Sequence, residues 1–278
     1  MKMINIRNLI LFFLTFAASS LAHAIGSCST SPITDTSECF AQPDIQQVTF
    51  YKAAVCTAQP GTPNLSTPID LSSCTTVYQS SAGGTVAIQQ GATTVLSNGD
   101  FTLPPPKTYS YIYVEISPTM NIQATKRFSR TITSRGDSTA GPVCWSITDT
   151  RFGLDTSNTG SSCGAAANGT LGFNTMKINT LDGTGGLIVT SKTFPTSKGA
   201  TLQAYLLTSD GKIATASSGS LGTVSKIGAY IPQSLTVTSN TAELVINYNN
   251  LQGTSVTVNA NTMGQYSAGP FDMFVEAQ

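Results

Sequence analysis

The stretch Leu202-Gln203-Ala204-Tyr205-Leu206-Leu207-Thr208-Ser209-Asp210-Gly211-Lys212-Ile213-Ala214 carries the clearest signal of fold class in this chain. A β-prone apolar run precedes Asp210-Gly211, and a shorter run follows it. Asp-Gly suits a type I′ hairpin turn, because both central residues of that turn need positive φ. Asn98-Gly99 offers a second turn of the same kind. The sequence therefore predicts antiparallel β-structure at both places.

The rest of the chain repeats this pattern of short β-prone runs separated by Gly, Pro and Asn. No long segment keeps the 3.6-residue apolar period of a helix. We expect strands near residues 47–55, 75–79, 85–89, 100–103, 109–116, 130–133, 172–179, 186–190, 200–207, 212–216, 234–238, 242–248, 255–259 and 271–276. Many short strands with turns between them predict an all-β protein with one or two disulfide-stapled antiparallel β-sandwich-like domains.

Residues 1–24 have the order of a secretory signal peptide. Lys2 and Arg7 precede an apolar run over 9–18, and Ala22-His23-Ala24 forms an A-x-A cleavage site. The run is too short and wrongly flanked for a membrane-spanning helix. We therefore expect a secreted or cell-surface protein whose mature chain begins at Ile25 and has no transmembrane segment.

The mature chain is expected to divide at its least regular part. We predict an N-terminal β-sandwich-like domain over 25–135, an irregular disulfide-bearing junction over 136–168 and a C-terminal β domain over 169–278. The alternative for 136–168 is a stapled surface loop inside one domain.

All six cysteines follow the predicted cleavage site. An even number in an exported chain predicts disulfides, and six cysteines permit 15 connectivities. Pairing between neighbours is the simplest arrangement, each bridge closing a loop worth about 3 kcal/mol by the chain-entropy estimate. The expected pairs are Cys28–Cys39, Cys56–Cys74 and Cys144–Cys163. The alternative is a lipoprotein signal at Ile25-Gly26-Ser27-Cys28, which would lipidate Cys28 and leave an odd number of thiols.

The net charge of the mature chain argues against nucleic acid as a partner. Removal of Lys2 and Arg7 leaves 12 of the 14 basic residues against 14 acidic ones, a net charge of −2. Such a balance gives no electrostatic footprint for nucleic acid. The surface must be built largely from hydroxyls and amides, which can hydrogen-bond to sugars or to a neighbouring subunit.

Residues Gly99-Asp100-Phe101-Thr102-Leu103-Pro104-Pro105-Pro106-Lys107-Thr108-Tyr109, followed by 111–115, resemble the strand–turn–strand of transthyretin-like modules, including the CnaB type. The resemblance covers at most 48–116 and departs from the pattern at Pro106-Lys107, where Gly is usual. It implies a β-sandwich used as a stalk or binding module. Some members carry a Lys–Asn isopeptide bond aided by an acidic residue; Lys52 and Glu115 lie on suitable strands, and no partner Asn can be assigned.

The mature chain lacks histidine, since His23 lies in the signal peptide. A Ser-His-Asp triad and His-ligated zinc are therefore excluded. A carboxylate pair could still hydrolyse glycosides, but no spacing singles one out. We expect no catalytic residues, no cofactor and a protein that is not an enzyme.

Three smaller features have a functional and an ordinary interpretation. Asp149, Asp155 and Asn158 offer oxygen ligands for calcium, although Asp and Asn are also common turn residues. Arg135-Gly136-Asp137 is an RGD tripeptide, which we expect to form a turn, with integrin-type recognition as the alternative. Trp145 is expected to pack on the neighbouring disulfide, with a sugar-stacking platform as the alternative.

These observations predict an exported structural or adhesive protein of a bacterial surface, with self-association or surface glycans and proteins as its partners. A filament or pilus-like subunit could assemble by β-strand addition, with 25–47 or Phe271-Asp272-Met273-Phe274-Val275-Glu276 as the donor. The alternative is a secreted carbohydrate-binding or glycan-acting protein.

Overall fold

The structure, a computed structural model, describes residues 28, 32–33, 39–89, 92, 94–153, 160–167, 169, 171–182, 187–269 and 271–278, with the backbone of Leu11–Phe12. The described residues form strands, turns and loops without a helix, which confirms the predicted all-β class. The strands are β1(Leu11–Phe12), β2(Cys39–Ala41), β3(Ile45–Cys56), β4(Cys74–Ile88), β5(Thr94–Val95), β6(Asp100–Phe101), β7(Lys107–Ile116), β8(Thr119–Gln123), β9(Thr125–Ser134), β10(Ala140–Ser146), β11(Asp149–Phe152), β12(Ser161–Gly164), β13(Asn174–Lys177), β14(Ser191–Pro195), β15(Thr201–Leu207), β16(Lys226–Val237), β17(Leu244–Asn249), β18(Thr254–Asn259), β19(Thr262–Ala268) and β20(Asp272–Ala277).

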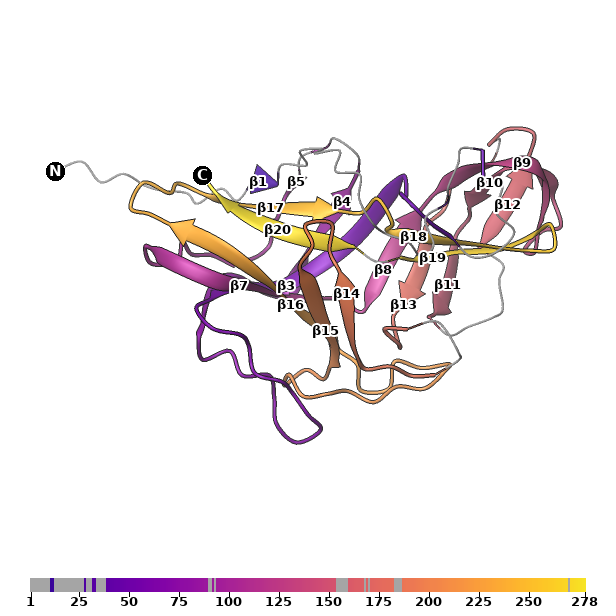
Figure 1. The fold of residues 1–278 in the computed structure, drawn as a ribbon. Helices are drawn as coiled ribbons and strands as arrows, with labels where there is room; N and C mark the ends of the chain where they lie inside the picture. Colours follow the sequence, from indigo (N-terminus) through magenta and orange to yellow (C-terminus); the bar gives the residue numbers. More distant parts are fainter. Residues whose placement is uncertain are drawn as a thin grey trace.

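A ten-stranded sheet forms the larger part of the molecule. Its main path is β11-β13-β8-β3-β7-β16-β15-β14, and β4 with β6 attaches at β3. The strand pair β17–β20 lies across one face of this sheet (Figure 1). Phe50, Val114 and Ile231 of the sheet belong to the same buried core as Ile246 and Val275 of the pair. The two layers form the sandwich-like arrangement that the sequence predicted.

A six-stranded sheet forms the second lobe, at the right of Figure 1. Its order is β12-β10-β9-β19-β18-β2. A separate core lies here, with Phe128, Ile132, Val256 and Tyr266 among its buried members.

The sheets do not follow the predicted division at 136–168. Strand β7 pairs antiparallel with β16, so residues from 25–135 and 169–278 share the larger sheet. The smaller sheet likewise joins β9 to β19. The expected irregular junction contains the regular strands β10, β11 and β12. Consecutive segments of the chain do not form separate domains here, because strands far apart in the sequence pair with one another.

A buried arginine connects the two sheets. Arg151, on β11 of the larger sheet, is 2% exposed and its Nη2 donates a hydrogen bond to the carbonyl oxygen of Tyr266 on β19, at 2.5 Å. The Tyr266 hydroxyl in turn donates to the carbonyl oxygen of Cys144, at 2.7 Å. Burial raises the pKa of Tyr266 well above its ordinary value, so the hydroxyl stays a donor.

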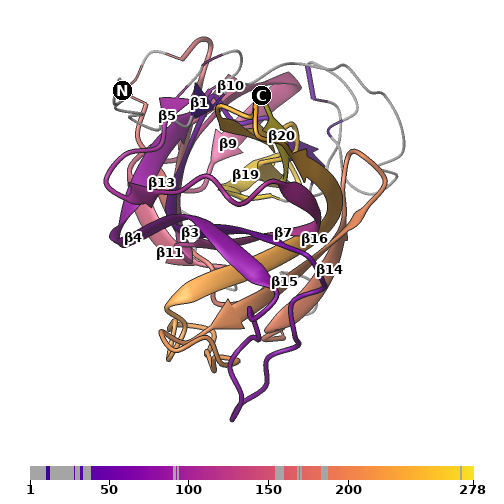
Figure 2. The same cartoon turned by 90° about the vertical axis from the view of Figure 1, so that its left-hand side faces the viewer.

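The disulfides are Cys28–Cys39, Cys56–Cys74 and Cys144–Cys163, which confirms the predicted pairing of neighbours. Cys56 faces Cys74 where β3 pairs with β4, so this bridge closes the base of the loop between those strands. That loop lies below the sheet in Figure 2, where Ile69 N–H donates to the carbonyl oxygen of Gly211 in a second loop, at 2.9 Å. Gly211 has φ +85°, but Asp210 is not among the described residues with positive φ, so this turn is not the predicted type I′ turn, which needs positive φ at both positions.

Trp145 does not pack on the disulfide beside it. Cys144 belongs to the core of the smaller sheet, and successive residues of a strand point to opposite faces. The indole lies instead over Gly164 and Gly169, where an added Cβ would come within 3.3 Å and 2.9 Å of ring atoms. At 6% exposure the ring does not form the open sugar-stacking platform that was the alternative.

Candidate assembly site on the strand pair β17–β20

Strands β17 and β20 form a two-stranded antiparallel sheet along their whole length, from Leu244 opposite Ala277 to Asn249 opposite Asp272. Leu244, Ile246 and Tyr248 point into the main core. Because side chains alternate along a strand, Val245 and Asn247 belong to the opposite, outer face.

The outer face of β17 carries a buried amide without a partner. Asn247 is 3% exposed, yet neither its Nδ2 nor its Oδ1 has a hydrogen-bond partner among the described residues. Its neighbour on this face, Val245, is fully buried but belongs to none of the described core clusters. A buried polar group without a partner loses about 1–3 kcal/mol relative to its hydrated state. The outer face of β17 therefore holds a buried amide whose hydrogen-bonding groups are unsatisfied among the described residues.

The edge of β20 is closed by a side chain of the larger sheet. Gln233 Oε1 accepts a hydrogen bond from Val275 N–H at 2.9 Å, and Gln233 Nε2 donates to the Val275 carbonyl oxygen. Gln233 can reach across because β16 is irregular between Pro232 and Leu235. The side-chain amide imitates the paired N–H and C=O of a neighbouring strand, so this edge is occupied.

The other edge of the pair belongs to β17. In the part of the chain that the structure describes, β20 is the one strand hydrogen-bonded to β17. Half of the backbone N–H and C=O groups of an edge strand point away from its partner, which makes such an edge a template for strand addition. Strand β1 lies beside β17 and pairs with β5 (Figure 1).

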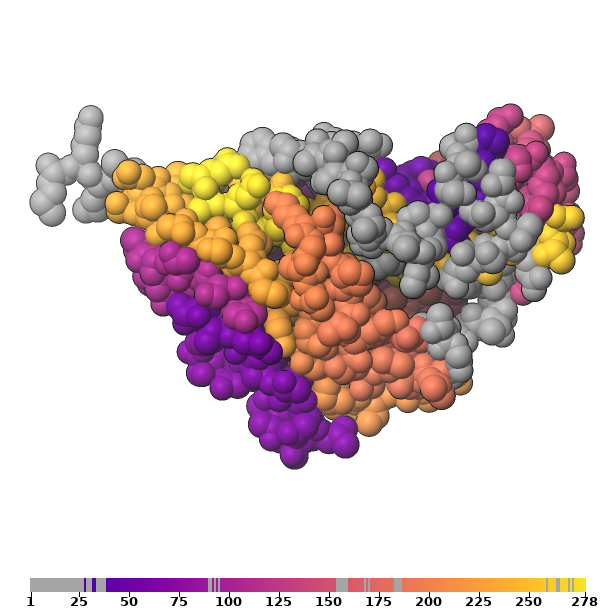
Figure 3. Space-filling model, in the orientation of Figure 1, coloured from indigo at the N-terminus to yellow at the C-terminus, as the bar shows by residue number. Residues whose placement is uncertain are grey.

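A lysine also reaches this face from the β14–β15 hairpin. Lys198 Nζ lies 3.2 Å from the ring centroid of Phe274 on β20. Figure 3 shows the tip of the hairpin against the yellow C-terminal strand. The outer face of the pair thus carries the Asn247 amide on β17 and, opposite it on β20, the Phe274 ring with the Lys198 cation.

Of the three calcium candidates, the structure describes only Asp149. Asp149 begins strand β11, and its Oδ1 accepts a hydrogen bond from Thr150 N–H at 2.8 Å. Asp155 and Asn158 lie outside the described residues. Among the described residues, no three His, Cys, Asp or Glu side chains are grouped as metal ligands.

Lys52 on β3 lies opposite Glu115 on β7. Their Nζ and Oε1 atoms are 3.9 Å apart, and Lys226 Nζ makes the shorter contact, 2.8 Å to Glu115 Oε2. Tyr113 hydroxyl donates to Glu115 Oε1 at 3.1 Å. Burial, with the adjacent Glu115 charge, raises the pKa of Tyr113. The arrangement is a half-buried ion-pair cluster.

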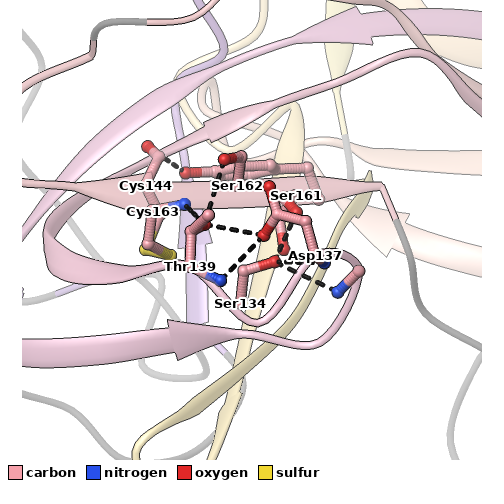
Figure 4. The surroundings of a disulfide bond; sticks show 9 residues. Ser134, Asp137, Thr139, Cys144, Ser161, Ser162 and Cys163 are labelled. Atoms are coloured by element: carbon pink, nitrogen blue, oxygen red, sulfur yellow. Dashed lines mark hydrogen bonds between the residues drawn. A yellow bond between two sulfur atoms is a disulfide. The ribbon is translucent and has the colours of Figure 1, made fainter.

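The RGD tripeptide forms a tight turn beside the Cys144–Cys163 disulfide (Figure 4). Asp137 Oδ1 accepts hydrogen bonds from Thr139 Oγ1 at 2.6 Å and from Thr139 N–H at 3.1 Å. Burial acts to raise the pKa of Asp137, but hydrogen bonds from Thr139, Ser162 and Ser134 outweigh it and bring it to about 2. The carboxylate is thus engaged by its own hairpin, which favours the turn interpretation.

The sequence does not predict the candidate site on β17, although Asn247 interrupts the otherwise apolar run Leu244-Val245-Ile246-Asn247-Tyr248. No helix within the described ranges is long and apolar enough to cross a membrane. No protein-family model, curated protein or solved structure matches the chain.

Proposed function

We propose that the mature chain is an exported structural or adhesive protein of a bacterial surface, whose copies assemble by β-strand addition at the β17 edge. The observation that carries this proposal is the buried, unpartnered amide of Asn247 on a strand whose one described ladder partner is β20. An incoming strand would supply hydrogen bonds to the backbone edge and to this amide. Each such bond contributes about 1 kcal/mol net.

The fold supports the acceptor role better than the donor role. The expected C-terminal donor is β20, which is already paired with β17 of its own chain. The expected N-terminal donor is also engaged where the structure describes it, because β2 pairs with β18 and β3 lies inside the larger sheet. The donor is therefore an edge strand of a second copy.

The three disulfides fit an exported protein. Structural disulfides persist in oxidising compartments and are rare where thiols are kept reduced. The surface chemistry fits as well, since 10% of residues are charged and the remaining polar surface consists of hydroxyls and amides.

The test compares assembly of the oxidised mature chain, residues 25–278, with that of Asn247→Lys. A charge at the edge blocks strand pairing. Asn240→Lys, in the exposed turn before β17, is the matched control. Sizing chromatography and negative-stain electron microscopy should show filaments or ordered oligomers for the wild type and the control. Asn247→Lys should remain monomeric.

Asn247→Asp, which adds a charge without adding volume, covers the case in which the lysine variant does not fold. Assembly of a folded Asn247→Lys or Asn247→Asp chain at the wild-type level contradicts the proposed site. A wild-type chain that stays monomeric contradicts assembly altogether and makes a glycan array the next screen, since carbohydrate binding is the alternative function.

A further inference from the structure

The backbone groups of β17 alternate between its two sides in a register that the structure fixes. Next to the strand, Glu243 and Gln278 exchange both of their N–H···O=C bonds, at 3.0 Å each. Hydrogen-bonded and non-hydrogen-bonded pairs alternate along an antiparallel ladder, so Asn247, four residues after Glu243, also directs its backbone groups to β20. Those of its neighbours Ile246 and Tyr248 point to the opposite side, which is the edge of the pair.

The Gln233 bridge supports this alternation independently. Val275 lies opposite Ile246 in the register, and Gln233 binds its N–H and C=O on the side of β20 that faces away from β17. Ile246 and Val275 therefore form a non-hydrogen-bonded pair. The backbone N–H and C=O of Ile246 accordingly point outward on β17, where a strand added at the edge would meet them.

This register determines what an added antiparallel strand places against Asn247. The residue opposite Asn247 would belong to a non-hydrogen-bonded pair, in which the two Cα atoms lie about 4.5 Å apart and the side chains are closest. The residues on either side of it would lie opposite Ile246 and Tyr248, whose side chains belong to the main core. Those two residues would therefore point to the core, and the one between them to the outer face.

We infer that Asn247 determines which strand the β17 edge accepts, and that the accepted strand carries a side-chain amide between two apolar residues. The inference rests on the proposed function, to which it adds the side chain that the incoming strand must supply. An Asn or Gln side chain has one acceptor oxygen and one NH₂ donor. It therefore matches both the Nδ2 and the Oδ1 of Asn247, which have no partner among the described residues.

Other side chains at this position satisfy the buried amide less well. A hydroxyl has a single hydrogen to donate, whereas an apolar side chain leaves both polar atoms of Asn247 unsatisfied. A buried polar group without a partner costs about 1–3 kcal/mol, and a site built around such a group rejects a ligand that lacks the matching atoms. Asn247 is 3% exposed, so water does not replace the missing partner.

Two designed peptides test this selectivity. The first, Lys-Val-Thr-Ile-Asn-Ile-Thr-Val-Lys, has Asn at its centre, and the second has Leu there. Fluorescence anisotropy of the labelled peptides measures their binding to the oxidised mature chain, residues 25–278, below the concentration at which the chain assembles. We expect the Asn peptide to bind about tenfold more tightly than the Leu peptide, a difference of about 1.4 kcal/mol.

Two variants of the protein complete the comparison. Asn247→Leu should lose this preference and bind the Leu peptide at least as tightly as the Asn peptide, because the variant has no amide to satisfy. Asn240→Leu, in the exposed turn before β17, is the matched control and should keep the wild-type preference. The comparison of the two peptides on the wild-type chain stands even if Asn247→Leu does not fold.

The outcomes separate this inference from the proposed function. Equal binding of the two peptides to the wild type, or tighter binding of the Leu peptide, overturns the selectivity and leaves strand addition at β17 standing. A preference for the Asn peptide that persists in a folded Asn247→Leu chain also overturns it, because the preference then arises elsewhere. A wild-type chain that binds neither peptide overturns both the selectivity and the proposed site at the β17 edge.

Discussion

Asn247 lies directly opposite Phe274 in the antiparallel register of β17 and β20, on the face of this strand pair that points away from the main core. The ring of Phe274 is covered by Lys198, whereas the amide of Asn247 has no hydrogen-bond partner among the described residues. The β20 side of the outer face is therefore satisfied and the β17 side is not. Under the proposed function, this asymmetry favours β17 over β20 as the site of strand addition.

Replacement of Gln233 by Leu is expected to loosen the C-terminal strand. The change removes both hydrogen bonds to Val275 and leaves a backbone N–H and a C=O of β20 without partners. The free energy of unfolding should fall by about 2 kcal/mol, measured by urea denaturation. Ser234→Ala, at the exposed neighbouring position, should change it by less than about 0.5 kcal/mol. Equal effects of the two variants would show that the Gln233 bridge does not hold β20.

Glu115→Gln is expected to lower the free energy of unfolding more than the removal of an exposed charge does. The Glu115 side chain is 5% exposed and compensates the ammonium groups of Lys52 and Lys226, which are 24% and 25% exposed. Loss of the carboxylate leaves two neighbouring cations without a counter-charge, so unfolding free energy should fall by about 3 kcal/mol. The exposed Glu276→Gln is the control and should lie within about 0.5 kcal/mol of wild type. A neutral Glu115→Gln would mean that the ion pairs add nothing to stability.

Removal of the Cys56–Cys74 bridge by a double Ala substitution tests the stapled loop. The bridge spans 18 residues of sequence and closes the loop beneath the larger sheet. Under oxidising conditions the free energy of unfolding should fall by about 3 kcal/mol on the chain-entropy estimate, and this decrease should appear as a lower urea midpoint. Added reductant should bring the wild type toward the variant and leave the variant less affected. An unchanged midpoint would show that the loop packs as well without its bridge.

The pH dependence of stability should contain a contribution from Asp137. Its pKa falls from an ordinary 3.8 to about 2 in the folded chain, so the unfolded chain binds the proton more tightly. The stabilisation is therefore complete above about pH 4 and is lost as the pH falls through about 2. Urea midpoints measured between pH 6 and pH 2 should decline less in Asp137→Asn than in the wild type. Identical declines in the two proteins would show that Asp137 does not contribute to the loss of stability at low pH.

Local features of the fold were predictable from the sequence because they depend on local chemistry. The pairing of neighbouring cysteines follows from short separations. The chain also turns back at Asp210-Gly211, although only Gly211 has positive φ and the turn is not the predicted type I′. The predicted strands 75–79 and 85–89 are one strand, β4, with register shifts near its centre. The predicted strand 212–216 is reduced to an isolated bridge between Leu207 and Ile213.

Non-local features could not be predicted in the same way. The pairing of β7 with β16 depends on complementary side chains on strands that are more than 100 residues apart, and no local pattern encodes it. Arg151 reads as a surface residue by type, because charged residues are rarely buried without a partner. Its burial depends on the Tyr266 carbonyl supplied by the other sheet. The β17 edge was missed for the same reason, since an edge exists only once the partner strands are known.

The measurement that decides the proposal is the assembly state of the oxidised mature chain and its Asn247→Lys variant, determined side by side by sizing chromatography and negative-stain electron microscopy. The account predicts filaments or ordered oligomers for the wild type and a folded monomer for Asn247→Lys. A monomeric wild type, or a folded variant that assembles equally well, would contradict it.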